Sequence, residues 1–334
     1  MAPLPFDPIT LLIRGFFVRP CQSVLPDQIW KAALAMEQML PFTVIIPAHN
    51  EETVIARCLK TVLKDAPTPH AMEIIVAANG CIDRTVEQAR TAAPEAIILD
   101  LPEGSKIAAI NAANRAATHT PRIYLDADVE CGYHSLRALA DALLEPGVMT
   151  SAPSISLDTS RCNWLMRAYY RAWLRQPYAL AGKGGAGCYA LSAEAIEVLG
   201  EFPNIIADDL WVHTRFADSQ RRYLARNGSD RPVHSIVHPP QTVMEQIKVE
   251  ARRVIGTAQV RQLHASQHMV TANDTGFIGS LVAARKSGAS VLDTVVFYAI
   301  KIAARLLARW RVRRGQGALW SRDLGSRKGS ASHV

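Results

Sequence analysis

The stretch from residue 42 to 128 alternates short apolar runs of β type with helical patterns, and this constrains the fold most. Between the runs, apolar residues recur at helical spacing, as in the segment Val54–Leu63, which would cover one face of a sheet. The alternation predicts βαβ units, and hence an α/β fold with a mainly parallel sheet flanked by helices. The four predicted strands are residues 42–47 (FTVIIP), 73–78 (EIIVAA), 96–100 (AIILD) and 122–128 (RIYLDAD).

Polar residues follow each of these four runs. Open parallel sheets bind ligands beyond the carboxyl ends of their strands, so one crevice is expected to gather these side chains. In the alternative interpretation, Asn50, Asp83 and Ser105 only cap the helices that follow. The polar residues are His49, Asn50 and Glu51; Asn79 and Asp83; the segment Asp100–Lys106; and Asp126 and Asp128.

The pair Asp126 and Asp128 stands at the end of the fourth run. On an extended strand, residues i and i+2 point to the same side, so both carboxylates would address one cation. Hard cations prefer carboxylate oxygens, and Mg²⁺ is usually held by one or two of them together with substrate phosphates. Solvated acids at a strand end are the simpler alternative.

Two further features follow in the chain. Gly184, Gly185, Ala186 and Gly187 supply small residues where backbone could approach a ligand. Asp208 and Asp209 then form a second acidic pair ahead of a helical pattern. Other helices are predicted at residues 134–144, 163–174, 192–199, 241–264 and 291–310, with possible strands after residue 144 and around His234 to His238.

In this order the motifs resemble those of the family 2 glycosyltransferases of GT-A fold. The resemblance runs from about Phe42 to Arg253, roughly two-thirds of the chain. It rests on VIIPAHNEE (44–52), NGCIDRT (79–85), GSKIAAINAA (104–113), the DAD of residues 126–128, GAGCYALSAEAI (185–196) and FPNIIADD (202–209).

The resemblance implies inverting, metal-dependent transfer of a sugar from a nucleoside diphosphate sugar. Asp126 and Asp128 would hold Mn²⁺ or Mg²⁺ on the diphosphate, and Asp209, paired with Asp208, would be the catalytic base. The glycine-rich residues 184–187 would form a donor and acceptor loop. The residues implied at the nucleotide-sugar site are Pro47, Ala48, His49, Asn50, Glu51, Asn79, Asp83, Lys106, Asp126, Ala127 and Asp128.

The chain also departs from the family pattern. Asn79 stands where many relatives carry aspartate, so the base of the nucleotide cannot be named. Processive relatives show Gln-x-x-Arg-Trp, whereas Val249 stands three residues after Gln246, which favours a non-processive enzyme. Arg252 and Arg253 are candidate phosphate contacts or a solvated helix face, and His238 is a candidate third metal ligand or an ordinary structural histidine.

Charge is concentrated near the C-terminus. Of the net charge of +7, nine Lys or Arg against one Asp lie between Lys301 and Lys328. The predicted helix at 291–310 pairs an apolar face with Lys301, Arg305 and Arg309, so it would either lie on an anionic bilayer or pack on the catalytic domain. A bilayer contact would suit a glycan or lipid-linked acceptor.

Length and composition bear on the domain organisation and the location of the protein. The 334 residues suffice for one large catalytic domain with additions, and we predict an N-terminal amphipathic segment at 1–40, a catalytic domain at 41–240 and a basic helical region at 241–334. Scattered cysteines without CxxC pairs favour reduced thiols and a cytoplasmic protein, peripheral on the membrane at most. The basic tail has no nucleic-acid recognition motif.

Two rival hypotheses remain at this stage. A phosphatase of the haloacid dehalogenase type also uses a strand that ends in DxD, but it wants Thr or Val where this chain has Glu130. A membrane-docked scaffold that kept the fold and lost turnover is the non-enzymatic alternative, and the retained carboxylates argue against it.

Overall fold

The structure is a computed structural model that describes residues 41–68, 70–180, 182, 187–263, 265–266, 268, 288 and 290–315. Residues 41–334 form one compact unit. The predicted segment 1–40 and the predicted loop residues Gly184, Gly185 and Ala186 lie outside the described residues.

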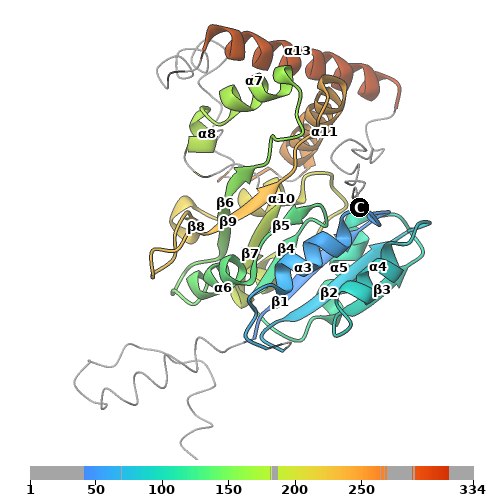
Figure 1. Cartoon of the computed structure of the whole chain (residues 1–334), viewed down its shortest axis with the longest axis vertical. Helices are drawn as coiled ribbons and strands as arrows, with labels where there is room; N and C mark the ends of the chain where they lie inside the picture. The colour runs from blue at the N-terminus through green and yellow to red at the C-terminus, as the bar shows by residue number, and fades with distance from the viewer. Residues whose placement is uncertain are drawn as a thin grey trace, which may run out of the picture. The chain divides into compact units, whose positions relative to one another are not determined.

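The parallel half of the sheet has the order β3-β2-β1-β4 (Figure 1). Its strands are β1 (Thr43–Ala48), β2 (Glu73–Asn79), β3 (Ile97–Leu101) and β4 (Arg122–Leu125). Three predicted strands are thus confirmed to within a residue or so at each end. The fourth was predicted too long, because β4 ends at Leu125 and the Asp126 N–H instead bonds the oxygen of Gly187 at 2.8 Å.

The other half of the sheet is mixed. It contains β5 (Val129–Glu130), β6 (Thr150–Leu157), β7 (Cys188–Leu191), β8 (Arg221–Leu224) and β9 (His234–Val237). β7 runs antiparallel to β4 and β6, while β8 and β9 pair in parallel with β6 and β5 closes antiparallel on β9. The whole is a mixed, mainly parallel sheet, as predicted.

Helices cover both faces of the sheet because successive strand residues point to opposite sides. Buried Val44 and Ile46 of β1 belong to the core beneath α3 (Ile55–Leu63), α4 (Thr85–Ala92) and α6 (Tyr133–Ala142). Ile45, between them, belongs to the core beneath α5 (Lys106–Ala116), α9 (Ala193–Leu199) and α10 (Asp208–His213).

A separate helical layer is built from α7 (Trp164–Trp173), α8 (Pro177–Leu180), α11 (Val243–Leu263) and α13 (Val291–Arg313) (Figure 1). α13 packs on α7 and α11 through Phe297, Ile300, Ala304 and Ala308. α11 and α13 confirm the two predicted C-terminal helices. Within the described part of the chain, no helix combines the length and apolar character needed to cross a bilayer.

Candidate functional site

The loops that follow β1 and β2 are tied to each other by hydrogen bonds. Asn50 has a left-handed backbone (φ 54°), and its side-chain oxygen accepts a hydrogen bond from the Ile82 N–H at 2.6 Å. The Glu51 N–H donates to the Thr85 hydroxyl at 2.6 Å. Asn50 therefore does not cap α3, as the simpler interpretation held; it joins two strand ends.

Asp83 belongs to the same tie. One carboxylate oxygen accepts hydrogen bonds from the N–H and hydroxyl of Thr85, and the other accepts from the Glu52 N–H at 3.2 Å. The carboxylate thus engages Thr85, the first residue of α4, although the N-cap residue of that helix is Arg84 and not Asp83. These contacts give Asp83 a structural role in shaping the loop.

The predicted nucleotide-site residues at the ends of β1 and β2 are mostly turned into the protein. Pro47, Ala48 and Glu51 are buried. Asn79 is also buried, and its amide nitrogen donates to the backbone oxygens of Ala48 at 2.8 Å and Ala77 at 3.2 Å. The hydrogen-bond donors of the Asn79 side chain are therefore already bonded to backbone oxygens of the sheet.

His49 connects the ends of β1, β2 and β3. Its ring nitrogen Nδ1 donates a hydrogen bond to the backbone oxygen of Asn79. The ring also rests on Gly104, where an added Cβ would come within 3.1 Å of Cε1. Gly80, with a left-handed φ of 56°, approaches Gly104 so closely that a Cβ would lie 2.7 Å from its nitrogen. Three strand ends thus converge, as the sequence predicted.

Lys106 extends this convergence to the fourth strand and to the second acidic pair. Ser105 caps α5 by accepting a hydrogen bond from the Ala108 N–H, which sets Lys106 as the first helical residue. Its ammonium lies 2.9 Å from Asp126 Oδ1 and 3.0 Å from Asp208 Oδ1. Burial opposes the charge of Lys106, but the two carboxylates prevail and raise its pKa above the ordinary value.

The DAD segment forms a turn, and this corrects the geometry predicted for it. The Val129 N–H bonds the oxygen of Asp126, so Asp126, Ala127 and Asp128 do not continue the strand. Ala127 is buried in the core and offers no side chain to a ligand. Gly187, with φ 61°, lies against the turn, where an added Cβ would stand 2.6 Å from Val129 and 3.2 Å from the Asp126 carboxylate.

Asp208 and Asp209 open α10 and differ in surroundings. The Asp208 side chain is 4% exposed, and its second oxygen accepts a hydrogen bond from the Tyr189 hydroxyl at 3.1 Å. Asp209 reaches solvent. Loss of hydration in the site and the neighbouring Asp208 charge raise the pKa of Asp209, while Lys106 acts in the opposite direction.

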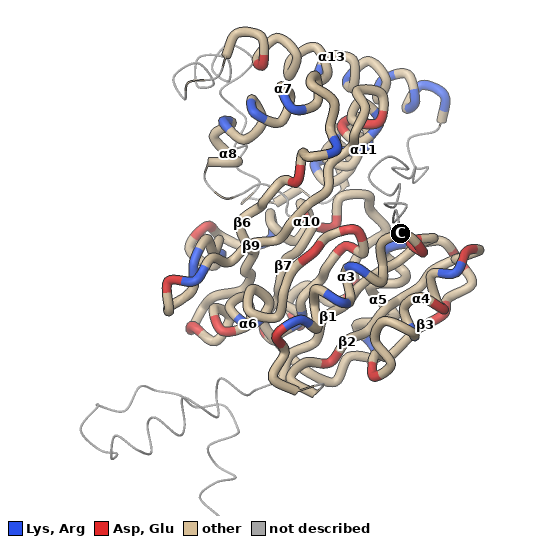
Figure 2. Tube along the Cα trace, in the orientation of Figure 1, with Lys and Arg blue, Asp and Glu red and all other residues tan. Residues whose placement is uncertain are grey.

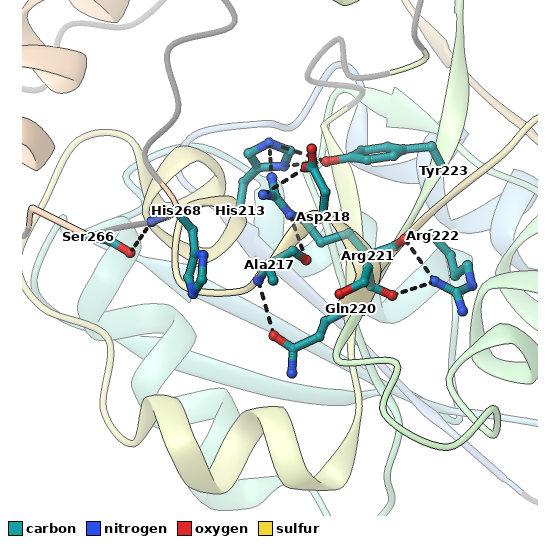
Figure 3. Close-up of polar contacts among 10 residues, drawn as sticks. His213, Ala217, Asp218, Gln220, Arg221, Arg222, Tyr223, Ser266 and His268 are labelled. Carbon is teal, nitrogen blue, oxygen red and sulfur yellow. Dashed lines mark hydrogen bonds and ion pairs between the residues drawn. The ribbon is translucent and has the colours of Figure 1, made fainter.

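The far end of α10 is held by a second polar cluster (Figure 3). The ring of His213 lies between the Tyr223 hydroxyl at 2.5 Å and the Arg221 guanidinium at 2.5 Å. Arg221 also pairs with Asp218 at 2.9 Å. These bonds join α10 to β8, so both ends of the helix that carries the acidic pair are anchored.

The predicted metal ligand His238 is engaged elsewhere. Its Nε2 lies 2.6 Å from Glu130 and its Nδ1 lies 3.3 Å from Asp158. Among the residues that the structure describes, no group of three or more His, Cys, Asp or Glu is arranged to hold a metal ion. Any cation at Asp126 and Asp128 would therefore need ligands from a substrate.

The predicted phosphate contact Arg253 pairs instead with Glu250 within α11, at 3.0 Å. Its neighbour Arg252 is half-buried on the same helix. Two residues that touch the site escaped prediction. Tyr189 bonds Asp208, and Gln259 of α11 bonds the segment before the acidic pair. Tyr189 lies within the GAGCYALSAEAI segment, but no role was assigned to it there, and Gln259 lies outside every quoted motif.

His49, Lys106, Asp126 and Asp208 gather at the carboxyl edge of the parallel strands, where open α/β sheets bind their ligands. A similar solved structure is the mannosyltransferase PcManGT from Pyrobaculum calidifontis in complex with GDP-mannose and Mn²⁺. Its TM-score is 0.58 at 19% identity, over 85% of this chain and 94% of that one. The fold is therefore that of the GT-A class.

The family follows from the sequence of the same region. Residues 43–192 match the model of glycosyl transferase family 2. This match and the fold together identify a glycosyltransferase and disfavour the phosphatase hypothesis. Another solved structure is glucosyl-3-phosphoglycerate synthase from Mycobacterium tuberculosis with Mn²⁺ and UDP-glucose, at TM-score 0.46 and 17% identity over 71% of this chain and 84% of that one. Among curated proteins no match was found.

Proposed function

We propose that this glycosyltransferase moves a sugar from a nucleoside diphosphate sugar to a hydroxyl acceptor, with inversion, metal assistance and no processivity. The observation that carries the proposal is the bridge from Lys106 to Asp126 and Asp208. This contact supports the proposal because it brings the DAD turn and the second acidic pair together near the carboxyl ends of the parallel strands. The GDP-mannose and Mn²⁺ held by the Pyrobaculum enzyme of the same fold support these ligand classes.

Asp126 and Asp128 would hold the Mn²⁺ or Mg²⁺. The Asp126 side chain is 40% exposed, already attracts one cation in Lys106, and offers the hard oxygen donors that these metals take. Two carboxylates with diphosphate oxygens completing the shell match the way Mg²⁺ is usually bound. When bound, the metal would stabilise the negative charge that develops on the departing diphosphate. We leave His238 out, because both its ring nitrogens contact carboxylates.

Asp209 would act as the general base. Asp208 is committed to Lys106 and Tyr189, whereas the Asp209 carboxylate reaches solvent where an acceptor can approach. Its raised pKa makes it a better proton acceptor than an ordinary aspartate. Asp209 would take the proton of the acceptor hydroxyl. At the same time the hydroxyl oxygen would attack the anomeric carbon from the side opposite the departing diphosphate. Asp208 would be the anchored partner that sets the position of Asp209.

The nucleotide would lie over the loops that follow β1 and β2. His49 is half-buried there and is held by its bond to Asn79. The hydrogen bonds of Asn50, Asp83 and Asn79 fix the conformation of these two loops. We therefore assign base contacts to His49 and to backbone groups of the two loops, and not to the Asn79 amide.

The acceptor would be a glycan or lipid-linked molecule, reached at the surface of an anionic membrane. α13 supports this, because the face opposite its buried residues is apolar and exposed. Arginines line the same helix toward its C-terminal end (Figure 2). An apolar stripe with basic flanks suits the interface of an anionic bilayer. The protein would then work in the cytoplasm, peripherally on the membrane.

The test is a panel of nucleotide sugars with Mn²⁺ or Mg²⁺, followed by release of nucleoside diphosphate and by NMR of the anomeric product. We expect one donor to be turned over, and Asp209→Asn to abolish transfer while donor binding persists. Asp65→Asn, an exposed left-handed position that asparagine tolerates, is the matched control and should keep full activity. Unchanged turnover in Asp209→Asn would show that Asp209 is not the general base. A product with the anomeric configuration of the donor would show that transfer does not proceed with inversion. No turnover, and no nucleotide binding, would favour the non-catalytic scaffold.

A further inference from the structure

The ammonium group of Lys106 contacts two carboxylates that differ in their exposure to solvent. Lys106 Nζ lies 2.9 Å from Asp126 Oδ1 and 3.0 Å from Asp208 Oδ1. Asp208 is buried and keeps a second partner in Tyr189, whereas Asp126 is open to solvent. Lys106 thus occupies one of the oxygens that the proposed metal would need.

A divalent cation and an ammonium on the same carboxylate repel each other, most strongly in a partly buried site where screening is weak. Charged Lys106 therefore disfavours a metal at Asp126 in the nucleotide-free protein. A diphosphate changes this balance, because its oxygens attract the ammonium and also ligate the metal.

Lys106 can move from Asp126 to a diphosphate by a rotation of its side chain, without a movement of the backbone. Its backbone is fixed at the first turn of α5 by the Ser105 cap. Asp208 retains the hydrogen bond from Tyr189 when the ammonium turns away, so its buried charge is not stranded.

We propose that Lys106 is an internal cation that competes with the metal for Asp126 and thereby makes metal binding depend on the nucleotide. This inference rests on the proposed function. Metal alone would bind weakly, because Lys106 holds Asp126. Nucleoside diphosphate would draw Lys106 away and tighten the metal, and by thermodynamic reciprocity the metal would tighten the nucleotide by the same factor.

The experiment measures free Mn²⁺ by electron paramagnetic resonance in titrations of the full chain, without nucleotide and with UDP, GDP, ADP, CDP or dTDP. The variants are Lys106→Met and Lys106→Gln, and Lys60→Met, an exposed lysine on α3, is the matched loss of one charge. We expect the wild type to bind Mn²⁺ about tenfold more tightly with the matching nucleotide, within the usual range of coupling. Both Lys106 variants should bind Mn²⁺ alone several-fold more tightly than the wild type, and Lys60→Met should not.

The outcomes separate the two proposals. If the wild type binds none of these nucleotides with Mn²⁺, the proposed function fails and the coupling falls with it. If the wild type binds a nucleotide together with Mn²⁺, but the Lys106 variants bind Mn²⁺ alone no better than the wild type, the competition is overturned and Lys106 is a fixed ion-pair partner. Thermal unfolding of both variants, which should remain cooperative, shows that a folded protein is compared; two substitutions keep the test decisive if one of them unfolds.

Discussion

The side-chain oxygen of Gln259 accepts a hydrogen bond from the backbone N–H of Ile206 at 3.0 Å, two residues before the acidic pair begins. Its amide nitrogen donates to the backbone oxygen of Asn204 at 3.3 Å. One turn earlier, Gly256 lets α11 approach so closely that an added Cβ would lie 3.0 Å from the Cβ of Ala207. A helix remote in sequence therefore holds the segment that leads into Asp208 and Asp209.

Gln259→Leu should lower turnover without weakening the nucleotide. The substitution removes both bonds to the segment before Asp208, so the position of Asp209 relaxes while the loops after β1 and β2 are untouched. We expect kcat to fall about tenfold, or ~1.4 kcal/mol in the activation free energy, with nucleotide affinity by calorimetry within about twofold of the wild type. Gln262→Leu, the same change at an exposed position of the same helix, is the control. A loss that appears only in nucleotide affinity would contradict this role of α11.

Gly187→Ala should damage the DAD turn itself. Gly187 has φ 61°, and an added Cβ would lie 2.6 Å from Val129 and 3.2 Å from the Asp126 carboxylate. Gly200→Ala is the matched control, because Gly200 has the same φ of 61° and nothing within 4 Å of an added Cβ. Chemical denaturation should show a loss of ~1–3 kcal/mol for Gly200→Ala from backbone strain, because its φ of 61° and ψ of −139° suit glycine alone. Gly187→Ala should lose ~1–3 kcal/mol more through the clash and weaken Mn²⁺ binding with nucleotide. Equal losses in the two variants would show that the turn accommodates the methyl group.

The sequence predicts the parallel half of this site well, and for a local reason. Apolar runs followed by polar residues mark strand ends, and parallel strands bring these ends to one edge whatever the rest of the chain does. The pairing of Lys106 with Asp208 spans 102 residues, and no local pattern encodes it. The turn at Asp126 depends on the backbone oxygen of Gly187, and the amide donors of Asn79 are bonded to backbone oxygens. Neither contact could be predicted without the tertiary structure.

The helical layer should depend on acidity through Glu250. Its buried carboxylate accepts bonds from Tyr169 at 2.9 Å, Arg253 at 3.0 Å and Lys301 at 2.7 Å. Burial raises its pKa, but Arg253, Lys301 and Tyr169 outweigh this and lower the pKa to about 2. Because the folded pKa lies below the ordinary glutamate value of 4.5, the stabilisation is complete above that pH. It is lost as pH falls from there toward 2.

We therefore expect the free energy of unfolding of the wild type to fall by a few kcal/mol across that window, beyond the loss seen in Glu250→Gln. At neutral pH the variant should be ~3 kcal/mol less stable, because it removes the buried carboxylate that pairs with Arg253 and Lys301. Glu201→Gln breaks an exposed pair with Arg115 and should change stability by less than ~1 kcal/mol. Denaturant unfolding at a series of pH values measures all three. Parallel pH profiles for wild type and Glu250→Gln would show that Glu250 does not carry the acid sensitivity.

α13 should bind anionic membranes through its outward face. Leu292 is 56% exposed, Val295 58%, Ile302 49% and Leu306 59%; they follow one another at intervals of three, seven and four, so they form one stripe. Vesicles of phosphatidylcholine with phosphatidylglycerol should sediment the protein, and pure phosphatidylcholine should not, because the arginines contribute about 1 kcal/mol each near an anionic surface. Replacing Ile302 and Leu306 by serine should reduce the bound fraction about tenfold at limiting lipid, since the two side chains are about half exposed and their further burial would together contribute ~1.5 kcal/mol. Val198→Ser, which changes an exposed valine of α9, should leave binding unchanged. Equal sedimentation with neutral vesicles, or unchanged binding of the double variant, would instead indicate that this stripe serves another surface.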